Sequence, residues 1–258
     1  MNNNNNNTHG FLKSLAREYW DEPTIQHMLK DVERIAFHLS LIGADKSRDR
    51  SVCDVGGGVS MFSLACAALG MKSTLVDDFG DPAYVQRGMM EILGLYRSRG
   101  VTVISRDVIR DGIGELASQS FDAITTFDSM EHWHNSPKRL FHQLVDALKP
   151  GGIFVIGVPN CVNLRKRITV PFGKGKWTQM SDWYEPDVFR SHVREPDVDD
   201  LRYIAKDLGL KNVRIVGKNW AGYDNSRPFV RAITPFVDSL LQLAPSLCGD
   251  IYLVANKP

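Results

Sequence analysis

Apolar residues come in two kinds of run, short unbroken runs and longer runs at helical spacing, which alternate from about residue 51 onward. Short apolar runs between turn residues are typical of buried strands, and a period of 3.6 residues is typical of helices that cover a sheet. The expected strands are 51–54, 72–76, 101–105, 121–127, 152–158, 213–216 and 251–255, and the expected helices between them are 61–69, 82–97, 137–148, 198–208 and 229–243. This alternation predicts a doubly wound α/β fold with a seven-stranded, mostly parallel sheet.

Three stretches lie outside this alternation. Residues 1–8 are rich in asparagine and have nothing to bury, so we expect a disordered tail or an added tag there. Residues 9–50 carry apolar positions at helical spacing, interrupted by Pro23, which predicts an N-terminal cap of two helices in front of the main domain, 51–258. Residues 160–195 lose all periodicity, and an irregular stretch of this length predicts a lid or substrate insertion.

The composition excludes several classes of protein. Of 258 residues, 43% are apolar and 24% charged, and the 31 basic residues nearly balance the 30 acidic ones. No global field therefore attracts nucleic acid or acidic membranes. No stretch approaches the roughly 20 apolar residues of a membrane span, and four scattered cysteines without a CxxC pair predict reduced thiols. We expect a cytoplasmic protein whose partner is a small molecule, neither nucleic acid nor an integral membrane.

The stretch VCDVGGGVS, residues 52–60, places three glycines between the first expected strand and the helix that follows it. A dinucleotide fingerprint would hold a pyrophosphate at this turn, but it requires glycine or alanine where Met61 stands. Asp54, two residues ahead of the glycines, would repel a pyrophosphate and attract a cation. The turn therefore favours a ligand that brings an amine.

A ligand with an ammonium group, a carboxylate and a ribose fits this pattern better. Its amine would lie near Asp54, its backbone would pass the three glycines, and its ribose hydroxyls would meet an acid at the end of the next expected strand. Asp77 stands there, with Asp78 as the neighbouring alternative. S-adenosylmethionine is such a ligand.

These residues resemble the first motif of class I S-adenosylmethionine-dependent methyltransferases, which reads D-x-G-x-G-x-G after the first strand; here Ser60 replaces the last glycine. FDAITTFDSMEHW (121–133) resembles the fourth-strand motif of the family, LKPGGIFVIGVPN (148–160) its next helix–turn–strand signature, and HVREPDVDDL (192–201) a later segment. The resemblance implies a Rossmann-like methyltransferase fold, S-adenosylmethionine as cofactor and methyl transfer as activity. The cofactor contacts that it implies are Asp54, Gly56, Gly57, Gly58, Asp77, Asp107 and Asp128. Asp107 and Asp128 could instead be loop acids or helix caps.

The residues after the fourth expected strand favour a hydroxyl over a nucleic-acid base as methyl acceptor. Amine methylation of bases commonly goes with an Asn/Asp-Pro-Pro-Tyr motif, whereas residues 128–131 read DSME. His132, with an ordinary pKa of about 6.5, suits removal of a hydroxyl proton and is the expected catalytic base. The alternative is that Glu131 and His132 form a structural signature that orients the loop. The spacing of Asp128, Glu131, His132 and His134 matches no defined ligand set, so we expect no metal.

Residues 160–195 are expected to cover the acceptor. They carry seven Lys or Arg against four Asp or Glu, together with Trp177, Trp183 and Tyr184. A basic, aromatic lid suits an acceptor with phosphate or carboxylate, such as a nucleotide-linked or lipid-linked sugar. A solvated basic loop whose aromatic residues pack on the core is an equal alternative. Asn160 and His192, at the two ends, are the expected substrate-binding residues.

The leading expectation is O-methylation of a saccharide or a quinone-like precursor, with N- or C-methylation of a small metabolite as the alternative. Two other readings stay open: a non-catalytic binding module, opposed by the near-intact motifs, and an NAD- or nucleotide-sugar-binding protein, opposed by Asp54 and Met61. The amphipathic stretch 229–243 is expected to face the core. A membrane surface, or a second copy of the chain in a homo-oligomer, is its alternative partner.

Overall fold

Seven strands form one sheet in the order β3-β2-β1-β4-β5-β7-β6. The computed structural model describes residues 2–20, 24–44, 49–80, 89–114, 116, 118–175, 178–223 and 225–258, excluding the side chains of 2–6 and 89. The strands are β1 Ser51–Val55, β2 Lys72–Asp77, β3 Thr102–Ser105, β4 Phe121–Phe127, β5 Leu148–Pro159, β6 Lys211–Lys218 and β7 Asp250–Asn256. Strands β1 to β5 pair in parallel, and β7 runs antiparallel to both of its neighbours. The predicted doubly wound, mostly parallel sheet is confirmed.

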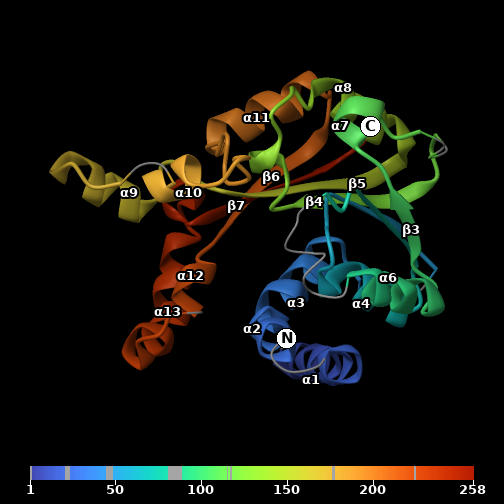
Figure 1. The fold of residues 1–258 in the computed structure, drawn as a ribbon, viewed down its shortest axis with the longest axis horizontal. Coiled ribbons are helices and arrows are strands. Elements are labelled where there is room, and N and C mark those ends of the chain that lie inside the picture. Colours follow the sequence, from blue (N-terminus) through green and yellow to red (C-terminus); the bar gives the residue numbers. More distant parts are fainter. Residues whose placement is uncertain are drawn as a thin grey trace.

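Helices cover both faces of this sheet, as Figure 1 shows. The helices of the alternating region are α4 Met61–Ala68, α6 Met89–Ser98, α7 Val108–Asp111, α8 Lys138–Ala147 and α11 Val198–Asp207. Apolar side chains of α8 and α11 join one buried cluster, and those of α4 and α6 join another. The first seven residues of the helix expected at 82–97 lie outside the described residues.

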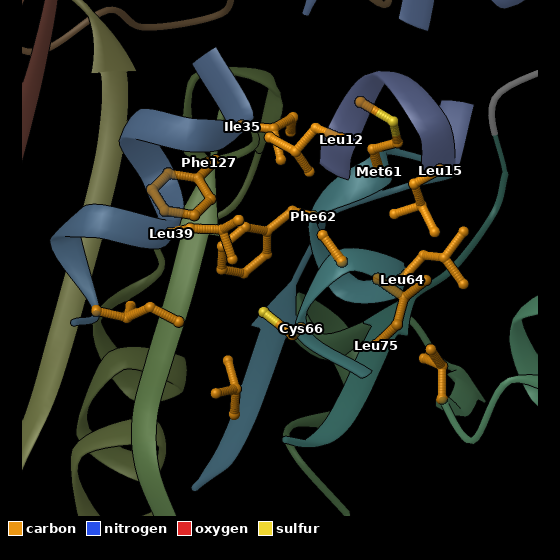
Figure 2. Packing of buried hydrophobic residues seen from close by; sticks show 14 of the residues in the cluster. Leu12, Leu15, Ile35, Leu39, Met61, Phe62, Leu64, Cys66, Leu75 and Phe127 are labelled. Carbon is orange, nitrogen blue, oxygen red and sulfur yellow. The ribbon is translucent and has the colours of Figure 1, made fainter. Parts of the chain in front are cut away.

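The N-terminal cap consists of three helices rather than two: α1 Asn2–Tyr19, α2 Thr24–Lys30 and α3 Val32–Leu41. Leu12 and Leu15 of α1 and Ile35 of α3 lie around the buried side chains of α4, as Figure 2 shows. The cap therefore shares the core of the main domain. The break expected at Pro23 lies outside the described residues.

Helix α1 includes the asparagine tract, for which we expected a disordered tail over residues 1–8. Asn7 is exposed, and the first fully buried side chain of the helix is Leu12. The polar tract is thus a helical extension of a segment that packs only farther along, and residue 1 lies outside the described residues.

Residues 160–195 form short helices that extend away from the sheet (yellow in Figure 1). They are α9 Leu164–Thr169, η2 Val170–Phe172 and α10 Met180–Tyr184. Trp183 and Tyr184 are exposed, so these two aromatic side chains do not pack on the core. Trp177 lies outside the described residues.

The helix expected to face the core at 229–243 is α13, Pro228–Leu241, and its apolar face is turned the other way. Phe229, Phe236 and Leu240 are 73%, 71% and 54% exposed. The buried side carries Asp238, which accepts hydrogen bonds from the side chains of Lys218, Asn219 and Tyr223. The expectation was wrong because periodicity groups residues on one face without deciding which face packs inward. Short helix α12, Trp220–Tyr223, links α13 to β6.

The described residues contain no helix long and apolar enough to cross a membrane. All four cysteines are free thiols in the structure, as the sequence predicted.

Candidate functional site

A cavity of about 450 Å³ opens at the carboxyl ends of strands β1 to β4. Its wall includes Gly56 after β1, Asp77 after β2, Asp107 after β3 and His132 after β4, with Arg190 from the 160–195 segment. Loops after parallel strands meet at one edge of a sheet, and ligands bind there where the strand order reverses. In this sheet the reversal lies between β1 and β4.

The glycine turn after β1 is shaped by the protein's own side chains. Gly56 has φ +72°, and a Cβ there would collide with the Ser129 hydroxyl; a Cβ on Gly57 would collide with the carboxylate of Asp54. Gly58, with φ +55°, donates its N–H to Oδ2 of Asp77 over 2.9 Å. Of the three glycines, only Gly56 lines the cavity. Glycine is thus required in this turn because the protein's own side chains pack against its backbone, as well as for the approach of a ligand from the cavity.

Ser60, the departure from the family motif, caps α4. Its extended backbone (φ −78°, ψ 158°) precedes Met61, and its hydroxyl accepts a hydrogen bond from the N–H of Phe62 over 3.4 Å. Serine is a favoured residue at this position because it satisfies an N–H that the helix leaves unpaired. The substitution of the last glycine therefore keeps the turn and the helix start intact.

Asp54 lies behind the turn rather than on the cavity wall. The side chain is 1% exposed, and its carboxylate accepts hydrogen bonds from the hydroxyls of Thr125 (2.7 Å) and Ser63 (3.4 Å). Burial raises the pKa of Asp54 to about 7, against the opposing effect of the Thr125 hydrogen bond. The expected direct contact between Asp54 and a ligand amine does not follow from this geometry, because Asp54 does not line the cavity and its carboxylate is already engaged by two hydroxyls.

Asp77 lines the cavity and is held in place by the backbone. Its Oδ1 accepts the N–H of Phe79 over 2.7 Å, while Oδ2 accepts that of Gly58. Asp78, the alternative, also lines the cavity but is exposed, and its Oδ1 accepts from Gly80. Two N–H groups aimed at one carboxylate fix its position, so Asp77 is the better oriented of the two acids.

Asp107 and Asp128 line the cavity and each has a structural partner as well. Asp107 caps α7 by accepting the N–H of Arg110 over 3.0 Å, so the helix-cap alternative is confirmed for it. Asp128, at φ +47°, forms an ion pair with Arg34 from α3 of the cap. No sequence signal links Arg34 to the site, because the two residues meet only when α3 packs on the sheet.

Glu131 and His132 form the 3₁₀ helix η1, Met130–His132, which anchors the end of the 160–195 segment. The backbone carbonyl of Glu131 accepts from the N–H of Val193 (2.7 Å) and of Arg194 (3.2 Å). The Nδ1 of His132 lies 2.9 Å from the carbonyl oxygen of Arg190. These contacts bring the His192 ring to 4.9 Å from that of His132, centroid to centroid.

Two carboxylates surround His192. Its Nδ1 lies 2.8 Å from Oε1 of Glu195, a hydrogen bond that raises the pKa of His192. Lys166 of α9 pairs with the other oxygen of Glu195. On the opposite side Glu131 is 1% exposed, and burial raises its pKa to about 7. Neither His192 nor Glu131 lines the cavity, but each has a side-chain atom within 4.8 Å of the ring of His132, which does.

Asn160, the other expected substrate contact, is fully buried and does not line the cavity. Its Nδ2 donates to the carbonyl oxygens of Ser246 and Cys248, each over 2.9 Å, and its Oδ1 accepts from Val162 over 3.0 Å. The side-chain amide thus ties the start of the 160–195 segment to the chain before β7. The position at one end of the 160–195 segment suggested a ligand contact, but the amide points into the interior.

The fold and the cavity together define a doubly wound α/β domain with a ligand site at its switch point. Residues 25–215 match the family model described as a methyltransferase domain, which is more than half of the chain. The protein belongs to this methyltransferase family. A search of curated protein sequences found no significant match.

Solved structures share the fold at low sequence identity. Phosphoethanolamine N-methyltransferase 2 of Haemonchus contortus, bound to S-adenosyl-L-methionine, is 16% identical with a TM-score of 0.55; 88% of this chain aligns, but it spans only about half (52%) of that enzyme. A methyltransferase of Archaeoglobus fulgidus is 18% identical over 90% of this chain and 94% of its own (TM-score 0.55). Geranyl diphosphate C-methyltransferase of Streptomyces coelicolor A3(2) is 15% identical over 90% and 82% (TM-score 0.55).

Proposed function

We propose that this protein transfers a methyl group from S-adenosylmethionine to a small molecule. The observation that carries the proposal is the cavity at the switch point, in which Gly56, Asp77 and Asp107 line the wall of a methyltransferase-family domain. Its volume of about 450 Å³ lies within the roughly 300–1,000 Å³ of small-molecule sites. The Haemonchus contortus and Streptomyces coelicolor structures hold S-adenosylmethionine and S-adenosylhomocysteine, which supports the same cofactor here.

The fixed carboxylate of Asp77 suits the two ribose hydroxyls of the cofactor, since a carboxylate accepts hydrogen bonds from both. Asp107, after the neighbouring strand, suits the adenine amine. The cofactor amine would meet the dipoles of the glycine turn, with Asp54 behind it as a buried support. The sulfonium would then point toward the loop after β4, where His132 lines the wall.

For the acceptor we propose a hydroxyl, on a saccharide or a quinone-like compound. In transfer to a hydroxyl, the oxygen lone pair attacks the methyl carbon, the carbon–sulfur bond breaks toward sulfur, and the hydroxyl proton must leave. His132 can take this proton, because a ring that donates Nδ1–H to the Arg190 carbonyl carries its lone pair on Nε2. N- or C-methylation is the alternative, since two of the neighbours named above are an N-methyltransferase and a C-methyltransferase.

We further propose that residues 160–195 act as a lid that takes an acceptor with phosphate or carboxylate. Arg190 from this segment and Arg106 after β3 both line the cavity and supply positive charge there. Val188 and Phe189 add apolar surface next to them. This combination favours an anionic group attached to a less polar body.

Calorimetry with S-adenosylmethionine and S-adenosylhomocysteine tests the cofactor. We expect both to bind one-to-one, Asp77→Ala to weaken binding at least tenfold, and Asp78→Ala, its exposed neighbour, to have a smaller effect. NAD serves as the competing ligand. Binding of NAD without either methyl-donor ligand would overturn the proposal.

Formation of S-adenosylhomocysteine with a panel of hydroxyl and amine acceptors tests the reaction. His132→Ala should leave cofactor binding unchanged and slow transfer to hydroxyls by about 10²–10⁴-fold. Turnover that is confined to amine acceptors, or that survives the substitution, would contradict the hydroxyl assignment.

A further inference from the structure

We propose that Glu131, His132 and His192 form a binding site for one divalent transition-metal ion, of the zinc or ferrous-iron class, at the wall of the cavity. Each side chain offers one ligand atom, and the three atoms lie within 4.8 Å of one another. The sequence spacing around Asp128 and His134 suggested no metal. His192, about sixty residues farther along, was not part of that comparison.

The three atoms are close enough to share one ion after a small adjustment. Metal–nitrogen and metal–oxygen bonds of about 2.1 Å put tetrahedral ligands about 3.4 Å apart. The present separations of at most 4.8 Å therefore need side-chain rotations of an ångström or so. Backbone movement is unnecessary, since the Glu131 carbonyl already holds Val193 and Arg194.

The Glu131 carboxylate is the second, independent indication of a ligand. It is 1% exposed, and its Oε2 has no hydrogen-bond partner among the described residues. A buried polar atom without a partner is costly and rare in folded proteins, unless a water molecule or an ion satisfies it. A metal ion is smaller than a water molecule, so it can reach an oxygen that a water probe does not.

Both histidines are oriented as metal ligands usually are. The Nδ1 of His132 faces the Arg190 carbonyl, and that of His192 faces the Glu195 carboxylate, so in the neutral rings Nε2 is the atom with a lone pair. Metal-binding histidines commonly donate their other N–H to a carboxylate or carbonyl in this way. Lys166 in turn fixes Glu195 by an ion pair. These groups are the orienting partners that such a site requires.

The ligand types decide which ions fit. Two imidazoles and one carboxylate suit zinc, iron, cobalt or nickel, whereas magnesium and calcium prefer oxygen ligands throughout. Three protein ligands leave at least one coordination position open, which is typical of catalytic rather than structural zinc. Of the three residues only His132 lines the cavity, so the open position would face the cavity.

A metal here changes the role of His132, because one lone pair cannot both bind an ion and take a proton. A bound metal ion would lower the pKa of an acceptor hydroxyl that it coordinates, and the hydroxyl proton would then pass to water instead of to the imidazole. The metal site depends on three side chains and on no property of the cofactor, so it is independent of cofactor binding and of methyl transfer as such, and it replaces only the base role proposed for His132.

The test is metal binding by the full chain after treatment with a chelator. Titration calorimetry with Zn²⁺ alone, and visible absorption with Co²⁺ alone, should each show one ion per chain. Glu131→Gln and His192→Ala should weaken Zn²⁺ binding at least 100-fold, and Glu195→Gln about 10–100-fold, because it only orients His192. His142→Ala is the control, since it removes an exposed histidine that pairs with Asp207 on the surface.

Circular dichroism of each variant checks that it folds, and the isosteric Glu131→Gln preserves shape if His192→Ala does not. Absence of one-to-one Zn²⁺ and Co²⁺ binding by the unmodified protein would overturn the metal site. The same holds if His142→Ala weakens binding as much as the ligand variants do, because the ion would then be bound by surface histidines. Either result leaves cofactor binding by Asp77 untouched, so the two proposals fail separately.

Discussion

The carboxylate of Asp54 occupies the space that a side chain on Gly57 would need. Asp54 lies in β1 and Gly57 in the turn that follows it, and the hydroxyls of Thr125 and Ser63 hold the carboxylate in place. The glycine-rich turn and the acid ahead of it are therefore one packing unit. The first prediction follows from this contact.

Gly57→Ala should destabilise the protein by about 1–3 kcal/mol, the usual cost of overpacking a well-packed interior. The new methyl group has to displace Asp54, which cannot move without losing its hydrogen bonds. Urea unfolding measures the change. Gly94→Ala is the matched control: a Cβ at this exposed position in α6 meets nothing within 4 Å, so it should be neutral or stabilise by up to about 1 kcal/mol. Equal effects of the two substitutions would contradict the packing argument.

The buried carboxyl of Asp54 should make stability depend on pH. Burial raises its pKa to about 7 in the folded protein, from 3.8 in the unfolded chain, so the folded state binds the proton more tightly between these values. Its contribution to the free energy of unfolding is full below pH 3.8 and declines as the pH rises toward 7, by at most about 4 kcal/mol. Asp54→Asn should flatten this decline, as urea unfolding at pH 5 and pH 8 would measure.

Asp122→Asn is the control for that experiment, because this acid has the opposite shift. Although partial burial opposes it, the hydrogen bonds from Lys149 and the Ser51 N–H lower the pKa of Asp122. A group whose pKa is lowered by folding stabilises the fold at pH values above its pKa in the unfolded chain. This stabilisation is lost as the pH falls through the pKa of the group in the folded protein. Asp122→Asn should therefore lose stability at neutral pH. A pH profile of Asp54→Asn identical to that of the unmodified protein would exclude Asp54 as its source.

Arg34→Met should weaken S-adenosylhomocysteine binding several-fold without unfolding the protein. Asp128 on the cavity wall would lose its partner from α3, whereas a partly exposed ion pair contributes only about 1 kcal/mol or less to stability. Calorimetry and a thermal melt separate the two effects. Arg202→Met removes an exposed ion pair with Asp199 on α11, neither residue of which lines the cavity, and should change neither quantity. If Arg34→Met bound S-adenosylhomocysteine as tightly as the unmodified protein, the ion pair from the N-terminal cap would have no role in ligand binding.

Asn160→Ala should affect stability rather than substrate binding. It removes the Nδ2 donor from the carbonyl of Cys248, whereas the carbonyl of Ser246 keeps a hydrogen bond from Arg167, and the lost hydrogen bonds cost about 1–3 kcal/mol. Chemical denaturation measures this loss, and KM for an identified acceptor should not move. Asn163→Ala, which removes the cap of α9 and one hydrogen bond to the Asn160 carbonyl oxygen, should cost about 1 kcal/mol. A raised KM with full stability would restore Asn160 as a substrate contact.

Much of the sheet could be predicted because β1, β2, β4, β5 and β7 bury short apolar runs, and burial of such runs dominates the local choice of structure. The strand at 121–127 was predicted to the residue, and β1 differs by one position. The glycine turn and Asp77 were recognisable because chemistry there depends on residues close in sequence. Ser129 and Arg106 line the same cavity from these loops and could have been included for the same reason.

Contacts between distant residues were not predictable in this way. Arg34 reaches Asp128 from a helix that precedes the sheet, and His192 reaches Glu131 only because backbone hydrogen bonds anchor its segment to η1. Hydrophobic periodicity along the sequence does not indicate which distant residues come into contact. For α13, likewise, the sequence showed an amphipathic pattern but did not show which face of the helix packs inward.

The sequence by itself thus determined the order of the seven strands and of the main helices between them, the glycine turn, and the family to which the chain belongs. These properties depend on local periodicity and on motifs whose residues are neighbours along the chain. The tertiary structure alone decided that Asp54 supports the turn from behind, that Asn160 faces the interior, that α13 turns its apolar face outward, and that Glu131, His132 and His192 converge. Each of these depends on which surfaces pack together, and packing is set by the whole chain rather than by any segment of it.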